Sequence, residues 1–137
     1  MEQQGRCLCG AVTFSARNVD PHAHACHCGT CRRWSGGPGL SAAVGSISFD
    51  GAEHVERFDS SDWAERGFCR RCGSHLFYRL KATDQYHVWL GAFDQPADFT
   101  LAGEIYVDEK PPGYAFAGDH PRLTAAEFLA SIGASGS

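Results

Sequence analysis

The stretch Gly67-Phe68-Cys69-Arg70-Arg71-Cys72-Gly73 is a short loop with two thiols and a glycine after the second cysteine. The stretch Gly5-Arg6-Cys7-Leu8-Cys9-Gly10 has the same character. Both thiolates of such a loop can reach one ion, and glycine permits the positive φ that the turn often needs. Four thiolates at about 2.3 Å make a closed tetrahedral zinc site, which would here join distant segments and stabilise the fold. The predicted ligands of this structural zinc are Cys7, Cys9, Cys69 and Cys72.

A second cluster, Cys26-His27-Cys28-Gly29-Thr30-Cys31, places three thiols within six residues. Cys26, Cys28 and Cys31 can hold one zinc ion and leave its fourth position open, which is typical of a catalytic zinc site. The two groups together account for all 7 cysteines of the chain. The spacing also allows Cys7 and Cys9 to share an ion with this second cluster. Neighbouring residues of an extended segment point to opposite sides, so we expect His27 to face away from the metal.

Length and composition limit the number of domains and the classes of binding partner. With 137 residues, the chain fits one globular domain, predicted over residues 1–133, followed by a flexible tail at residues 134–137. Hydrophobic residues make up 43% and charged residues 20%, which is typical of a folded protein. The formal net charge is −4. A basic surface for nucleic acid or for an anionic membrane is therefore not expected.

The expected location is the cytoplasm. The N-terminus lacks the apolar region of a signal peptide, and no apolar run approaches the ~20 residues of a transmembrane helix. Clustered cysteines in a reducing compartment usually bind metal or serve catalysis. The alternative is a secreted disulfide domain. It would keep one free thiol, because an odd number of cysteines excludes complete pairing within the chain.

Short strands separated by Gly, Asp and Pro predict a mainly β fold. Aromatic and β-branched residues favour strands at residues 12–14, 47–49, 55–58, 76–78, 86–90 and 104–108. Asp50-Gly51 predicts a tight hairpin between the second and third of these strands.

Two short helices complete the prediction. A capping box at Thr124–Glu127, followed by Phe128, Leu129 and Ile132 on one face, predicts a C-terminal helix. A helical turn is expected from Thr30 to Trp34.

The three cysteine motifs, in this order, resemble the glutathione-dependent formaldehyde-activating enzyme family, whose domain also occurs in centromere protein V. The resemblance covers about residues 5–115 and includes Val88-Trp89-Leu90-Gly91-Ala92-Phe93-Asp94-Gln95-Pro96. It implies a zinc-bound β-tent fold with short peripheral helices. It also implies the same division of ligands, with the four-cysteine group structural and the three-cysteine group at the active-site zinc. Tyr114 departs from the pattern, because many relatives carry tryptophan there.

The resemblance implies a carbon–sulfur lyase that joins glutathione to formaldehyde as S-hydroxymethylglutathione. The partners would be a small-molecule thiol and an aldehyde, and the cofactors one structural zinc and a second, labile zinc. A free thiol with a pKa near 8.5 is mostly protonated at neutral pH, and zinc can bind its thiolate as a fourth ligand. Arg32 and Arg33, directly after Cys31, can pair with a carboxylate of glutathione, although solvation or donation to the metal thiolates is an equal alternative.

Two other classes of function also use clustered cysteines. A non-catalytic binding module, stabilised by zinc, needs the four-cysteine site alone. A nucleic-acid-binding zinc ribbon is disfavoured by the acidic charge balance.

Overall fold

The computed structural model of the chain describes residues 1–133. Eleven strands, two seven-residue α-helices and four 3-10 helices form this part, which confirms the prediction of a mainly β fold with short helices. The predicted tail, residues 134–137, lies outside the described residues. Across residues 1–133, no helix has the length and apolar character needed to cross a membrane.

The described chain forms two compact units. The first unit comprises residues 1–23 and 41–100, and the second comprises residues 24–40 and the chain from Leu101 onward. The chain changes unit within three strands, β3 (His22–Cys26), β4 (Gly39–Val44) and β10 (Thr100–Ile105). Each predicted thiol group falls within one unit, so its geometry is internal to that unit. The single domain expected over residues 1–133 stays a prediction.

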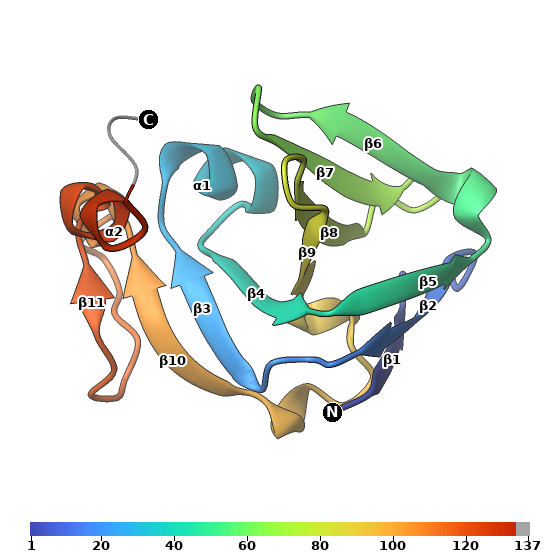
Figure 1. The fold of residues 1–137 in the computed structure, drawn as a ribbon, viewed down its shortest axis with the longest axis horizontal. Helices are drawn as coiled ribbons and strands as arrows, with labels where there is room; N and C mark the ends of the chain where they lie inside the picture. Colours follow the sequence, from blue (N-terminus) through green and yellow to red (C-terminus); the bar gives the residue numbers. More distant parts are fainter. Residues whose placement is uncertain (134–137) are drawn as a thin grey trace. The chain divides into compact units, whose positions relative to one another are not determined.

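The first unit contains two antiparallel sets of strands (Figure 1). In one set, β2 (Thr13–Arg17) lies between β1 (Gln3–Arg6) and β5 (Ser46–Asp50). In the other set, residues 41–44 of β4 pair with β9, and the order continues through β8 and β7 to β6. The bounds of these strands are Gln85–Trp89 for β9, His75–Leu80 for β8, Ala64–Cys69 for β7 and Val55–Asp59 for β6. Two 3-10 helices, η2 (Leu90–Ala92) and η3 (Pro96–Asp98), lead from β9 toward β10.

The predicted hairpin at Asp50-Gly51 is wrong, although both strands exist. β5 pairs with β2, whereas β6 pairs with β7, and the 3-10 helix η1 (Ala52–His54) separates them. Gly51 has a φ of 75°, and a Cβ there would lie 2.0 Å from the carbonyl oxygen of Ala11. The glycine therefore serves a close backbone approach rather than a two-residue turn.

A buried aromatic cluster joins the two sets of strands in the first unit. The ring centroids of Phe14 and Phe49 are 6.1 Å apart, and those of Phe49 and Phe77 are 5.5 Å apart. Phe77 is fully buried, and burial of such a side chain contributes roughly 1.5–3 kcal/mol. Cys7 and Cys69 belong to the same buried cluster, so the core fixes one thiol of each cysteine loop.

The second unit is built around β10, which lies between β3 and the two-residue strand β11 (Arg122–Leu123) (Figure 1). β11 runs parallel to β10. The predicted strand over 104–108 ends early: β10 stops at Ile105, because Tyr106 adopts a left-handed conformation with a φ of 58° and η4 (Val107–Glu109) follows.

Both predicted helices are confirmed. Helix α1 spans Gly29–Ser35 and contains the expected turn from Thr30 to Trp34. Helix α2 spans Ala125–Ser131 and begins with the predicted capping box. The Glu127 N–H donates to Thr124 Oγ1 at 3.2 Å, and the Thr124 N–H donates to Glu127 Oε1 at 2.9 Å.

Replacement of Gly67 with alanine tests the packing of the first unit. Gly67 pairs with Phe77 across β7 and β8, and a Cβ would lie 2.2 Å from the Phe77 ring. We expect Gly67→Ala to lower the free energy of unfolding by about 1–3 kcal/mol, because the ring must move within a packed core. The measurement is urea denaturation of the zinc-loaded protein. The control is Gly91→Ala, where nothing lies within 4 Å; equal stability of the two variants would contradict this packing.

Candidate functional site

The first thiol group lies wholly in the first unit and unites all four predicted cysteines. The Sγ atoms of Cys7, Cys9, Cys69 and Cys72 all lie within 4.8 Å of one another. The Sγ–Sγ distance is 3.6 Å for Cys7 and Cys9, and 3.8 Å for Cys9 and Cys69. Ligands at about 2.3 Å around a tetrahedral ion are separated by about 3.8 Å. The four donors therefore have the number and close spacing that a tetrahedral zinc site needs.

The loop after β1 presents its sulfurs through backbone hydrogen bonds. The Val12 N–H donates to Cys7 Sγ at 3.4 Å, and the Gly10 N–H donates to the Cys7 carbonyl at 3.2 Å. Gly10 closes this turn with a φ of 80°. This is the conformation for which the sequence supplies a glycine.

The loop after β7 repeats this geometry. The Arg71 N–H donates to Cys69 Sγ at 3.4 Å, and the Gly73 N–H donates to the Cys69 carbonyl at 2.7 Å. Gly73 has a φ of 79°. The Ser74 Oγ lies 3.2 Å from Cys72 Sγ and accepts the Leu8 N–H at 3.0 Å, so one hydroxyl links the two cysteine loops.

These surroundings favour the thiolate form of Cys7 and Cys72 but not of Cys9. Burial opposes ionisation of Cys7, but hydrogen bonds from the Val12 backbone and from the Cys9 and Cys69 thiols lower the pKa of Cys7 below its usual value. The Ser74 hydroxyl and the Cys9 backbone lower the pKa of Cys72 to about 5. A backbone hydrogen bond from Ala11 favours the Cys9 thiolate, yet burial and the three neighbouring sulfurs raise the pKa of Cys9 to about 11. Four thiolates here require a cation.

The second thiol group lies wholly in the second unit. Cys26 ends β3, Cys28 caps α1, and Cys31 lies in the first turn of that helix. Their Sγ atoms lie within 4.8 Å of one another, and the Cys31 N–H donates to Cys28 Sγ at 3.3 Å. Within residues 1–133, this group has three sulfur donors and no fourth His, Cys, Asp or Glu. The donors fit a zinc ion that keeps one position open.

Crowding also governs ionisation in the second group. Hydrogen bonds from the Cys26 and Cys31 thiols are the largest cause that lowers the pKa of Cys28 far below its usual value. The same contacts, together with burial, raise the pKa of Cys26. The group therefore holds one thiolate readily, and a bound cation is needed for all three.

Arg32 and Arg33 occupy the last turn of α1, and both are exposed. Within the described chain, neither guanidinium forms an ion pair with a carboxylate. Cations are favourable in the last turn of a helix, so this position also has a purely structural explanation.

His27 is not among the grouped metal donors, as expected, but its partner was not predicted. The ring is 1% exposed, and Nε2 lies 2.8 Å from Oε1 of Glu104, which is itself 2% exposed. Glu104 also contacts His120 and Arg122. A glutamate within a predicted strand carries no sequence signal for burial, so reasoning from the sequence missed this cluster.

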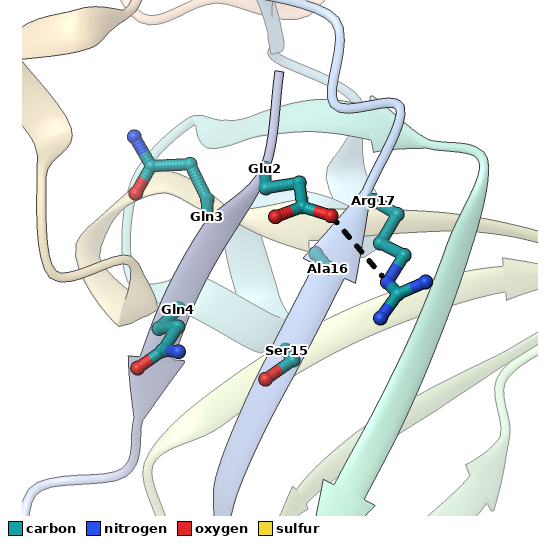
Figure 2. Close-up of a pocket in the computed structure, with 6 residues that line it drawn as sticks. All are labelled: Glu2, Gln3, Gln4, Ser15, Ala16 and Arg17. Carbon is teal, nitrogen blue, oxygen red and sulfur yellow. Dashed lines mark ion pairs between the residues drawn. The ribbon is translucent and has the colours of Figure 1, made fainter.

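A shallow pocket of about 340 Å³ lies on β1 and β2 of the first unit (Figure 2). It is lined by Glu2, Gln3, Gln4, Ser15, Ala16 and Arg17. Figure 2 shows the carboxylate of Glu2 facing the guanidinium of Arg17. This ion pair measures 3.6 Å, and both side chains are about three-quarters exposed. Such a pair contributes little, and none of the lining residues is a thiol or an imidazole.

The comparisons with known proteins agree with the three cysteine motifs. The family model described as glutathione-dependent formaldehyde-activating enzyme matches residues 2–109. A Schizosaccharomyces pombe protein named as an uncharacterized lyase is 32% identical over 133 residues, which cover 96% of this chain and 97% of that protein. A Halomonas elongata protein provisionally named a glutathione-dependent formaldehyde-activating enzyme is 30% identical, with coverage of 95% and 96%.

A solved structure supports the fold. The crystal structure of a Rhodobacter sphaeroides protein matches with a TM-score of 0.58 and 21% identity, covering 87% of this chain and 98% of that one. This likeness concerns the fold alone. The match of the family model over residues 2–109 and the two relatives of similar length establish the relationship: the chain belongs to the glutathione-dependent formaldehyde-activating enzyme family.

Proposed function

We propose that the chain is a zinc-dependent carbon–sulfur lyase that makes and breaks the adduct of a small-molecule thiol with an aldehyde. Glutathione and formaldehyde, which give S-hydroxymethylglutathione, are the proposed pair. Family membership and the names of the two relatives support this class of reaction. The observation that carries the proposal is the three-thiol group, because it is one donor short of a closed tetrahedral zinc site.

The proposal assigns different roles to the two thiol groups. The group around Cys69 holds a structural zinc, since its four donors complete a tetrahedron. The group of Cys26, Cys28 and Cys31 holds a labile zinc at the reaction site. Zinc bound there would supply the positive charge that keeps a substrate thiol ionised at neutral pH. A cytoplasmic location, where thiols stay reduced, suits both sites.

The reaction requires no oxidant or reductant. The substrate sulfur forms a bond with the carbonyl carbon, and the proton that the thiol loses ends on the carbonyl oxygen. The chain must therefore bind the thiol, hold it as a thiolate and orient it. Arg32 and Arg33 are proposed to orient it, because they follow Cys31 directly and a guanidinium fork matches a carboxylate of glutathione.

Serine substitutions separate the two thiol groups. We expect Cys69→Ser to unfold the protein or make it insoluble, because a structural zinc contributes about 10–16 kcal/mol in small zinc domains, against a typical domain stability of about 5–15 kcal/mol. Cys28→Ser should stay folded and lose one zinc per chain. Elemental analysis and circular dichroism measure both effects. If Cys28→Ser unfolds as readily as Cys69→Ser, the division of roles is wrong.

Exchange NMR with ¹³C-formaldehyde and glutathione tests the reaction itself. The zinc-loaded protein should accelerate exchange between formaldehyde hydrate and S-hydroxymethylglutathione, and Cys28→Ser should return the rate to the uncatalysed value. No acceleration by the wild-type protein would exclude this reaction. One tightly held zinc, with function unchanged in Cys28→Ser, would instead indicate the non-catalytic binding module.

The arginines are tested by Arg32→Gln and Arg33→Gln. Loss of a charged hydrogen bond to a carboxylate is worth about 1.5–3 kcal/mol, so at least one variant should raise the KM for glutathione about 10-fold or more. Zinc content should not change. The control is Arg17→Gln, an exposed arginine of the first unit. If both variants have the same KM as the control, neither arginine binds the substrate carboxylate.

A further inference from the structure

A buried carboxylate in the second unit has three cationic or imidazole partners. Glu104 Oε1 lies 2.8 Å from His27 Nε2. Its Oε2 lies 2.6 Å from His120 Nε2 and 3.0 Å from Arg122 Nε. Burial opposes the charge of Glu104, but the hydrogen bonds with His120 and His27 and the charge of Arg122 hold the pKa of Glu104 below its usual value. Both oxygens therefore accept, and His27 Nε2 carries the hydrogen.

The residue held by this carboxylate is the one between two thiol ligands. The His27 backbone N–H donates to the Ile105 carbonyl at 3.1 Å, while its ring donates to the preceding residue of β10, Glu104. Farther along, the Gly29 N–H donates to Glu109 Oε1 at 3.0 Å. The segment 104–109 thus fixes residues 27–29 at three points.

The ring of His27 has one polar anchor. Its Nδ1 is buried and has no hydrogen-bond partner within residues 1–133. The ring centroids of Phe116 and Tyr114 lie 6.0 and 6.4 Å from the centroid of the His27 ring. Arg122 holds that segment by donating to the carbonyls of Phe116 at 2.8 Å and Gly118 at 2.9 Å. Apolar surroundings strengthen the bond to Glu104 and leave the ring no alternative partner of equal strength.

Stability alone is a weak reason for this arrangement. Burying ionised groups is costly, and well-packed apolar side chains of similar size often replace them without loss of stability. A directional hydrogen bond, however, fixes an orientation that apolar packing does not. At metal sites, groups hydrogen-bonded to the ligands fix ligand geometry in this way, and their loss typically lowers metal affinity 10- to 100-fold. A group that fixes the backbone between two ligands can act by the same constraint.

We propose that Glu104 and His27 are positioning residues for the second thiol group. Their hydrogen bond sets the conformation of the Cys26–Cys28 segment, and hence the affinity and coordination geometry of the ion that the three thiols hold. The inference rests on the proposed function only in taking that group as a metal site. Neither residue is expected to contact the metal or the substrate.

The test is Glu104→Gln, loaded with Co²⁺ at the second group and with Zn²⁺ retained at the first. Dissociation constants come from chelator competition, and the thiolate-to-cobalt and d–d absorption bands report geometry. We expect the Co²⁺ affinity of the second group to fall about 10- to 100-fold, with shifted d–d bands. His27→Phe, which keeps an aromatic ring but removes both ring nitrogens, should give the same loss, and the double variant should add nothing further.

The matched control is Thr124→Ala, which removes the capping box of α2 and destabilises the same unit by loss of a helix cap. If Glu104 has a merely structural role, Glu104→Gln should lower the thermal stability and leave the Co²⁺ affinity and the absorption bands unchanged, as in this control. That result would overturn the proposal. If Glu104→Gln does not fold, the same measurements on His27→Phe decide the question.

The wild-type protein separates this inference from the proposed function. Binding of Co²⁺ at the second group without exchange of glutathione and formaldehyde would refute the proposed function and leave the positioning role standing. Wild-type protein that takes up no second ion would overturn both.

Discussion

Four sulfur atoms crowd within 4.8 Å of one another in the first unit, although two of them come from a segment 60 residues farther along the chain. Two unit charges about 4 Å apart repel by about 4 kcal/mol at an effective dielectric constant of 20. Burial and the three neighbouring sulfurs accordingly raise the pKa of Cys9, whereas hydrogen bonds from Ser74 and the Cys9 backbone lower that of Cys72. A divalent cation offsets this repulsion. Such a cation would join the loop after β1 to the loop after β7, two loops whose Cys7 and Cys69 also belong to the buried core.

In the second unit, the same repulsion acts among three sulfurs. Here polar groups of the segment 104–109 hold the ligand segment: Glu104 and Ile105 bind His27, and Glu109 binds Gly29. The first group needs no outside donor to complete a tetrahedron, whereas the second does. This difference in donor number is the physical basis for assigning stability to one group and thiol chemistry to the other.

The sequence predicted the features that local chemistry determines. Cysteine spacing identified both thiol groups, glycine marked the left-handed turns at Gly10 and Gly73, and the capping box located α2. Strand pairing was not predictable in the same way: Asp50-Gly51 has the composition of a hairpin, yet the contact of Gly51 with Ala11 is set by tertiary packing. Glu104 was missed because three partners distant in the sequence compensate its burial.

The most direct test is a crystal structure of the zinc-loaded protein with glutathione, with zinc located by anomalous diffraction. We expect two zinc peaks per chain. One is bound by Cys7, Cys9, Cys69 and Cys72, and the other by Cys26, Cys28 and Cys31 with the glutathione sulfur as fourth ligand. A single zinc peak, a fourth protein ligand at the second site, or glutathione bound away from it would contradict the account.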